Sequence, residues 1–219
     1  MSDNSKNAAV LWTGGKDCAL AYYKAQQAGY SITHLVTFTP KNPNFVAHSL
    51  EFMQKQVDAI GLPHIKVLVQ QPMKESYEDG IQSLKDRYKI NTLITGDIDE
   101  VENHNNWIEE CSKKSGMNVF NPLWKKNREE LLLELIHLNF NAIFTLTNKP
   151  FFNPNWIGRQ IDHRALKELR TLDIDISGEN GEYHTMVLDA PFFKQKIEDV
   201  SYEVEETERY YFLKYSSSD

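Results

Sequence analysis

The segment "TGGKDC", residues 13–18, contains the residue types with the clearest chemical meaning, and it interrupts an apolar stretch near the start of the chain. Gly14 and Gly15 can adopt positive φ and let a ligand approach the backbone with no Cβ in the way. Helix formers follow, so the first N–H groups of that helix would point at the ligand together with its positive end. Lys16 adds a positive charge, and Asp17 could hold Mg²⁺ or cap the helix. These features predict a polyphosphate site.

The spacing is not that of a Walker A loop, which places four residues between its first glycine and a Gly-Lys pair followed by Ser or Thr. A tight turn with a solvated lysine is the simpler alternative. The position of the loop favours a binding site, because ligands of open α/β sheets bind beyond the carboxyl ends of the strands. As part of a turn, Lys16 is expected to be exposed, so that replacing it would hardly affect folding.

Strand-like and helix-like segments alternate through the first 120 residues at the spacing of βαβ units. Strands are expected at 8–12, 31–39, 65–69, 91–95 and 118–120, and helices at 18–27, 49–60, 74–88 and 102–115. This alternation predicts an α/β fold with an open, mostly parallel Rossmann-like sheet covered on both faces.

The pattern changes after "NPLW", residues 121–124. Helices are expected at 129–138 and 161–171, and strands at 142–147, 185–189 and 200–214. We therefore expect a domain boundary near residue 125, with one domain at 1–125 and a smaller α+β domain at 126–219.

The composition narrows the class of protein. The 219 residues are 41% hydrophobic, and 24 basic against 31 acidic side chains give a net charge of −7. This charge makes bulk nucleic acid an unlikely partner. Two cysteines without a CxxC pair indicate a reducing compartment. The polar start and the absence of a long apolar run predict a soluble, cytoplasmic protein.

Further polar residues are expected at the same edge of the sheet. Asp97 follows the fourth expected strand and could hold Mg²⁺ or a ribose, whereas Asp99 and Glu100 fit an acidic helix start equally well. His48 follows the second strand and is either a nucleotide or substrate contact or an ordinary surface histidine. His104 and His184 have no metal-ligand spacing with a cysteine, which argues against zinc.

Several segments resemble known families. "TGGKDC" resembles the SGGxDS signature of the PP-loop ATP pyrophosphatases, which cleave ATP between its α and β phosphates. "GDIDEVENHNNWIEECSKKSG" (96–116), "PLW" (122–124), "WIGRQID" (156–162) and "GENGEYHTMVLDAPFF" (178–193) resemble successive blocks of the diphthine–ammonia ligase family. The blocks keep the family's order over nearly the whole chain, and the last is highly specific.

The resemblance implies a fold of the PP-loop, adenine nucleotide alpha hydrolase-like type, and sites for ATP and Mg²⁺. It also implies that residues 1–125 are an ATP-binding domain and residues 126–219 a substrate-binding domain. The residues implied to bind ATP are Thr13, Gly14, Gly15, Lys16, Asp17, Cys18, His48, Gly96 and Asp97, with Asp17 and Asp97 also near Mg²⁺. The catalytic candidates are Lys16, Asp17 and Glu182. The candidates for substrate binding are Trp107, Trp156, Glu179, Glu182, Tyr183, His184 and Thr185, among which the aromatic rings could face the trimethylammonium group of diphthine. A solvated hairpin loop at 178–185 and core positions for the aromatic residues are the alternatives.

Two residues depart from the phosphate motif. Thr13 keeps the hydroxyl group of the family's serine, whereas Cys18 replaces a hydroxyl with a thiol, a weaker donor. The thiol at a helix N-terminus beside Lys16 could be more reactive than that of Cys111, which is expected to be buried. Cys18 could instead pack inward as a small hydrophobic residue.

The implied activity is that of an AMP-forming ligase. ATP would adenylate a carboxylate with release of pyrophosphate, and ammonia would then displace AMP to leave an amide. The carboxylate would be diphthine on elongation factor 2 in an archaeal or eukaryotic source. A PP-loop enzyme adenylating another small carboxylate or a tRNA base, and a non-catalytic ATP-binding protein, remain alternatives. A homodimer is left open.

Overall fold

The structure is a computed structural model that describes residues 7–43, 46–100, 106–198 and 200–215. The chain divides into two compact units. The first unit contains Met1–Thr13, Asp17–Asn44 and Leu62–Lys125. The second unit contains Gly14–Lys16, Phe45–Gly61 and Lys126–Asp219, so two short early segments belong with the C-terminal part of the chain.

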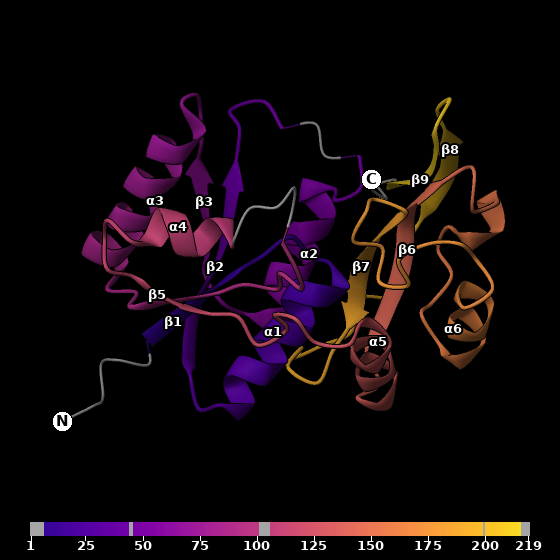
Figure 1. Cartoon of the computed structure of the whole chain (residues 1–219), viewed down its shortest axis with the longest axis horizontal. Helices are drawn as coiled ribbons and strands as arrows, with labels where there is room; N and C mark the ends of the chain where they lie inside the picture. The colour runs from indigo at the N-terminus through magenta and orange to yellow at the C-terminus, as the bar shows by residue number, and fades with distance from the viewer. Residues whose placement is uncertain (1–6, 44–45, 101–105, 199, 216–219) are drawn as a thin grey trace. The chain divides into compact units, whose positions relative to one another are not determined.

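The first unit contains a five-stranded parallel sheet in the order β3-β2-β1-β4-β5 (Figure 1). The strands are β1 (Asn7–Leu11), β2 (Ser31–Thr39), β3 (His64–Leu68), β4 (Thr92–Ile94) and β5 (Asn118–Phe120), and the helices are α1 (Lys16–Gln27), α3 (Met73–Tyr88) and α4 (Trp107–Ser112). Buried side chains from the sheet and from α3 and α4 form its core, including Ala9, Val36, Ile81, Leu84, Leu93, Ile108 and Cys111.

The strand order places a topological switch point beside β1. This strand pairs with β2 on one side and with β4 on the other. The loops that follow β1 and β4 therefore leave the sheet at neighbouring carboxyl ends, where ligands of open α/β sheets bind. The first of these loops is the segment at residues 13–18, and the second contains Gly96 and Asp97.

The second unit contains a four-stranded antiparallel sheet in the order β7-β6-β9-β8. Its elements are α2 (Leu50–Ile60), α5 (Arg128–His137), β6 (Asn141–Asn148), the 3₁₀ turn η2 (Pro154–Trp156), α6 (His163–Leu169), β7 (Tyr183–Asp189), β8 (Tyr202–Glu206) and β9 (Tyr210–Tyr215). Together the two sheets confirm the predicted α/β fold with a C-terminal α+β part.

Two elements differ from the prediction. The single strand expected at 200–214 is a hairpin, because the Thr207 hydroxyl accepts hydrogen bonds from the N–H groups of Arg209 and Tyr210 and turns the chain. The helix expected at 102–115 is described only from its cap at Asn106 onward, where the Asn106 side chain accepts from the Glu109 N–H. Residues 101–105 lie outside the described part of the chain.

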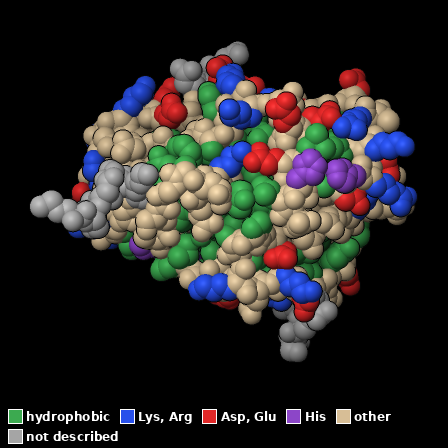
Figure 2. All heavy atoms as spheres, turned by 90° about the horizontal axis from the view of Figure 1, so that it is seen from below, with side chains coloured by type: hydrophobic (Ala, Val, Ile, Leu, Met, Phe, Trp, Pro, Cys, Tyr) green, Lys and Arg blue, Asp and Glu red, His purple; other side chains and the backbone are tan. Residues whose placement is uncertain are grey.

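Basic and acidic side chains are interspersed on the face shown in Figure 2. Among the residues described, no helix is both long and apolar enough to cross a membrane.

Candidate functional site

The turn after β1 is fixed by contacts of Gly14. Its φ of +83° lies in the left-handed region, and a Cβ at this position would lie 2.3 Å from Oε1 of Gln56. The Gly14 carbonyl accepts hydrogen bonds from the Val187 N–H at 2.9 Å and from Nε2 of Gln56 at 2.9 Å. Both the backbone conformation and the close neighbour therefore require glycine here.

Lys16 is also held by the second unit. Its backbone N–H donates to Oγ1 of Thr185 at 3.1 Å, and its Nζ lies 5.6 Å from the centroid of the Tyr183 ring. Only 3% of its surface is exposed. The expectation of an exposed lysine is thus wrong, because residues at the start of β7 cover it. A buried ammonium group over an aromatic face is a stronger electrostatic feature than a solvated one.

The two loops at the switch point touch within the first unit. A Cβ on Gly96 would lie 2.6 Å from the carbonyl carbon of Asp17 and 2.6 Å from the backbone nitrogen of Cys18. Only a residue without a side chain permits this approach. Thr13, which is exposed, donates its hydroxyl to Sγ of Cys18 at 3.5 Å.

Asp97 directly follows that contact. Its Oδ2 accepts hydrogen bonds from Oγ1 of Thr95 at 2.7 Å and from Nδ2 of Asn106 at 2.8 Å, which fixes an exposed carboxylate. Asp17 occupies the first turn of α1 and is half-buried. Mg²⁺ in nucleotide sites is held by one or two carboxylates together with phosphate oxygens and water, and these two side chains fit that donor set. Within the described ranges, no group of three or more His, Cys, Asp or Glu forms a complete metal site.

Glu182 is engaged by its own loop. Its carboxylate, in a side chain that is only 5% exposed, accepts the N–H of Asp175 at 2.9 Å and the N–H of Asn180 at 2.9 Å. The Asn180 side chain adds a third contact at 3.3 Å. These bonds give Glu182 a clear structural role, because charge-assisted bonds to backbone amides fix the loop before β7. Glu179, on the same loop, is exposed.

The aromatic candidates of the second unit meet in one cluster. Phe144 lies edge-on to both Trp156 and Tyr183, with centroids 5.1 and 4.9 Å away. The Tyr183 hydroxyl donates to the Ile176 carbonyl at 2.7 Å, and the Arg159 guanidinium lies 4.5 Å from the Trp156 ring centroid. Trp156 and Tyr183 are both buried. These contacts favour the expected alternative of a core position, and the binding of a substrate cation by these rings stays a prediction.

Trp107 belongs to the first unit. It begins α4, is 38% exposed, and lies edge-on to Tyr77, which stacks on Phe38. Its exposed ring is available to a ligand, unlike those of the cluster around Phe144.

His48 and His184 form a pair of imidazole rings. Their centroids are 5.4 Å apart and the rings are nearly perpendicular. Nδ1 of His48 is buried and has no hydrogen-bond partner among the described residues. Burial, together with the neighbouring His184, lowers the pKa of His48 to about 3, so this ring is neutral at physiological pH.

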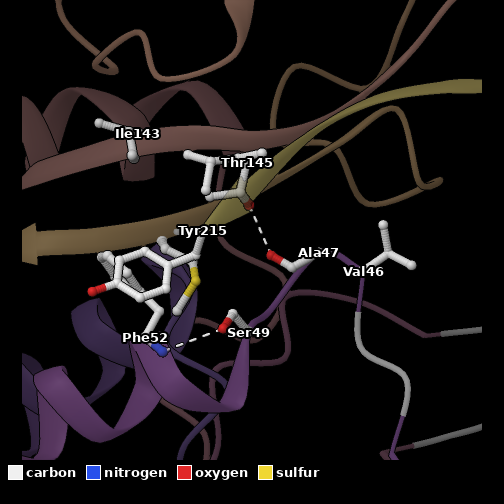
Figure 3. Close-up of a pocket in the computed structure, with 9 residues that line it drawn as sticks. Val46, Ala47, Ser49, Phe52, Ile143, Thr145 and Tyr215 are labelled. Carbon is white, nitrogen blue, oxygen red and sulfur yellow. Dashed lines mark hydrogen bonds between the residues drawn. The ribbon is translucent and has the colours of Figure 1, made fainter. Parts of the chain in front are cut away.

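A small apolar pocket lies beside these residues in the second unit (Figure 3). Ala47 and Ser49 flank His48 and line the pocket with Thr145, whose hydroxyl donates to the Ala47 carbonyl at 2.9 Å. Met186 lines the pocket as well, and its Cε would lie 2.9 Å from a Cβ on Gly14. The pocket is thus adjacent to the turn at Gly14.

Both cysteines are buried, Cys18 with 5% and Cys111 with 0% exposure. The expectation for Cys111 is confirmed, and burial with the nearby Glu78 raises the pKa of its thiol to about 11.

Sequence reasoning missed Gln56, whose amide contacts Gly14. A glutamine inside a helix carries no motif, and only its place among buried neighbours such as Phe52 and Met53 could have indicated it.

Comparison with known proteins gives matches over both parts of the chain. Residues 6–119 match the family described as diphthamide synthase N-terminal domain, and residues 127–217 match diphthamide synthase C-terminal domain. The chain is 26% identical over 222 residues to a diphthine–ammonia ligase of Bos taurus, covering 86% of this chain and 81% of that protein. The corresponding protein of Homo sapiens is 26% identical over 218 residues with the same coverage. A crystal structure of a predicted tRNA methyltransferase subunit from Methanocaldococcus jannaschii is 20% identical, with a TM-score of 0.47, and covers 84% of this chain and 97% of that one.

Proposed function

Because the chain belongs to the diphthamide synthase family, we propose that it is an ATP-dependent, AMP-forming ligase that converts a carboxylate into an amide. The observation that carries the proposal is the loop at residues 13–18, which leaves β1 at the switch point of the parallel sheet. Its glycine conformation, its cation and its place at the start of α1 suit the β and γ phosphates of ATP.

The chemistry starts from the stability of a carboxylate, whose oxygen is a very poor leaving group. Attack of the carboxylate oxygen on the α phosphate forms an acyl adenylate and breaks the bond to the β phosphate, which releases pyrophosphate. Ammonia then attacks the acyl carbon, AMP leaves, and one proton is lost as the amide forms. The protein has to position the reactants and neutralise charge, and it needs no covalent nucleophile.

The residues of the loop take separate parts in this scheme. Backbone N–H groups of the loop other than that of Lys16, which donates to Thr185, bind phosphate oxygens, and the Lys16 ammonium offsets charge on the departing pyrophosphate. Asp17 and Asp97 would hold Mg²⁺, which when bound neutralises phosphate charge. Glu182 and the residues beside it, Glu179, Tyr183, His184 and Thr185, are assigned to the substrate.

The relatives named diphthine–ammonia ligases support diphthine on elongation factor 2 as the carboxylate, with free ammonia as the nitrogen donor. A cytoplasmic location belongs to the same proposal. We also keep residues 1–125 as the ATP-binding domain and 126–219 as the substrate-binding domain.

Product analysis tests this function directly. The protein is mixed with ATP, Mg²⁺, ammonium and elongation factor 2 bearing diphthine, and nucleotides are separated by chromatography. AMP and pyrophosphate are expected in equal amounts with the new amide. ADP and phosphate as the sole products would overturn the proposal, and AMP formed without amide would show that the nucleotide is hydrolysed by water without transfer to ammonia.

A lysine variant connects the activity to the loop. Lys16→Met keeps most of the side-chain volume but removes the charge. A hydrogen bond between charged groups contributes ~1.5–3 kcal/mol, so its loss predicts roughly a 10- to 150-fold weaker ATP affinity. Lys126→Met, at an exposed position, is the control. Equal ATP affinity in Lys16→Met and wild type would show that the lysine does not contact the nucleotide.

A further inference from the structure

We propose that Gln56 is a positioning residue of the loop at residues 13–18, here called the phosphate loop, an inference that rests on the proposed ATP site. Gln56 lies on α2 and is fully buried. Its Nε2 donates to the Gly14 carbonyl at 2.9 Å and to the Val187 carbonyl at 2.8 Å. One side-chain amide therefore joins the turn after β1 to strand β7.

The network uses both donors of the Gln56 amide and both lone pairs of the Gly14 carbonyl. A glutamine amide nitrogen has two N–H donors, and each of these meets one carbonyl. The Gly14 carbonyl has two lone pairs, one for Gln56 and one for the Val187 N–H at 2.9 Å. Because both donors of this amide and both lone pairs of the Gly14 carbonyl are used, the three groups fix one another in a single arrangement.

The place of Gln56 on its helix shows that this amide is not an incidental surface group. It lies three and four residues after Met53 and Phe52, so the three side chains share one buried face of α2. A polar amide on such a face costs free energy unless it is paired. The helix itself is held at both ends, by the Ser49 side chain that accepts from the Phe52 N–H and by a left-handed Gly61.

The consequence for the phosphate loop follows from peptide geometry. A trans peptide is planar, so the Gly14 C=O and the Gly15 N–H point in opposite directions. Holding the carbonyl toward Gln56 and Val187 directs the Gly15 N–H away from them. Oε1 of Gln56 also closes the space beside the Gly14 Cα, where a Cβ would lie 2.3 Å away. Gln56 thus orients a backbone donor of the loop without touching nucleotide itself.

The test compares two substitutions on the same helix. Gln56→Met keeps the shape but removes both donors, whereas Gln54→Met changes an exposed glutamine that pairs with Asp58 at 3.0 Å. Calorimetric titration with Mg-ATP at 10 °C should show affinity at least about tenfold weaker for Gln56→Met and unchanged for Gln54→Met. Unchanged affinity in Gln56→Met, with a lowered Tm, would overturn the inference and leave Gln56 as a packing residue.

Hydrogen exchange gives a readout that needs no nucleotide. Amide exchange of the segment 13–17 should speed up in Gln56→Met, while exchange in α3, which belongs to the first unit, should stay at the wild-type rate. If wild type fails to bind ATP but this local change is seen, the proposed function fails and the positioning role stands. If exchange in the loop is unaltered, the positioning role fails whatever the nucleotide result.

A third variant covers the case in which Gln56→Met does not fold. Gln56→Glu places a carboxylate against two carbonyls, and protonation restores one O–H donor. The ratio of its ATP affinity to that of wild type should be smaller at pH 8 than at pH 6. A constant ratio between the two pH values would count against the inference.

Discussion

The backbone N–H of Lys16 donates a hydrogen bond of 3.1 Å to the hydroxyl of Thr185, although 169 positions separate the two residues. Both residues are buried. Thr185 was expected to contact the substrate, and the structure places its hydroxyl on the first residue of α1. The start of β7 thus contributes directly to the conformation of the phosphate loop.

Thr185→Val should weaken ATP binding and lower stability, because the variant keeps the shape but removes the acceptor of the Lys16 N–H. The expected loss is ~1–3 kcal/mol, or about 2–4 °C in Tm for each kcal/mol in a chain of this size. Thr185→Ser, which keeps the hydroxyl, should retain most of the ATP affinity in calorimetry. Thr171→Val changes an exposed threonine and serves as the control. Full ATP affinity in Thr185→Val would mean that the bond does not shape the site.

Glu182→Gln should destabilise the loop at residues 175–182. The carboxylate accepts hydrogen bonds from two backbone N–H groups, and the new amide nitrogen would face one of these donors. At least one hydrogen bond to a charged group, worth ~1.5–3 kcal/mol, is therefore lost. Scanning calorimetry should show a Tm several degrees lower, with little change in Glu179→Gln, whose side chain is exposed. An unaltered Tm combined with complete loss of amide formation would instead support the catalytic role assigned to Glu182.

His48 should make the protein less stable as the pH falls. Its pKa is about 3 in the folded state and ~6.5 when unfolded, so between these values the unfolded chain binds the proton more strongly. The contribution of His48 to the free energy of unfolding is fully present above pH ~6.5. It decreases below this pH, by about 2 kcal/mol at pH 5. Urea unfolding of wild type and His48→Gln at pH 7.5 and pH 5 measures the difference.

The comparison with His48→Gln matters because burial also lowers the pKa of His34 and His64, which add to the same acid sensitivity. His48→Gln should therefore reduce the stability lost between the two pH values without abolishing it. His163→Gln, at an exposed position of α6, should leave the loss as it is in wild type. The same loss in His48→Gln and wild type would contradict the prediction.

Cys111 should resist alkylation in the native protein. Its side chain is fully buried and its pKa is about 11, so little thiolate is present at neutral pH. Cys18 is expected to react faster, since it lies in the first turn of α1, and Mg-ATP should protect it. Brief iodoacetamide treatment followed by peptide mapping tests both statements. Equal labelling of the two cysteines, unaffected by nucleotide, would show that Cys18 only replaces a serine.

Periodicity and turn residues were sufficient to predict most of the fold. Helices α2 and α5 lie close to the expected ranges 49–60 and 129–138, because the Ser49 and Asn127 caps and the left-handed Gly61 that define their ends are local features of the sequence. The hairpin at Thr207 was missed, since "TER" contains none of the glycine or asparagine that normally indicates such a turn.

The candidate site was less accessible to sequence reasoning. The loop at residues 13–18 could be located because its chemistry is contiguous in the sequence. The burial of Lys16 could not, because it depends on Tyr183 and Thr185, which reach it only through tertiary contacts. The same holds for Gln56, whose function is defined by two carbonyl groups on distant segments.

The grouping of Gly14–Lys16 and Phe45–Gly61 with the C-terminal part of the chain has a consequence for synthesis on the ribosome. The turn after β1 emerges well before the partners that hold it, at residues 185 and 187. Contacts with such sequence separation form late and slow folding. The nascent chain can therefore assemble much of its parallel sheet while the phosphate loop still lacks its native geometry, so ATP affinity should appear only when translation has passed β7.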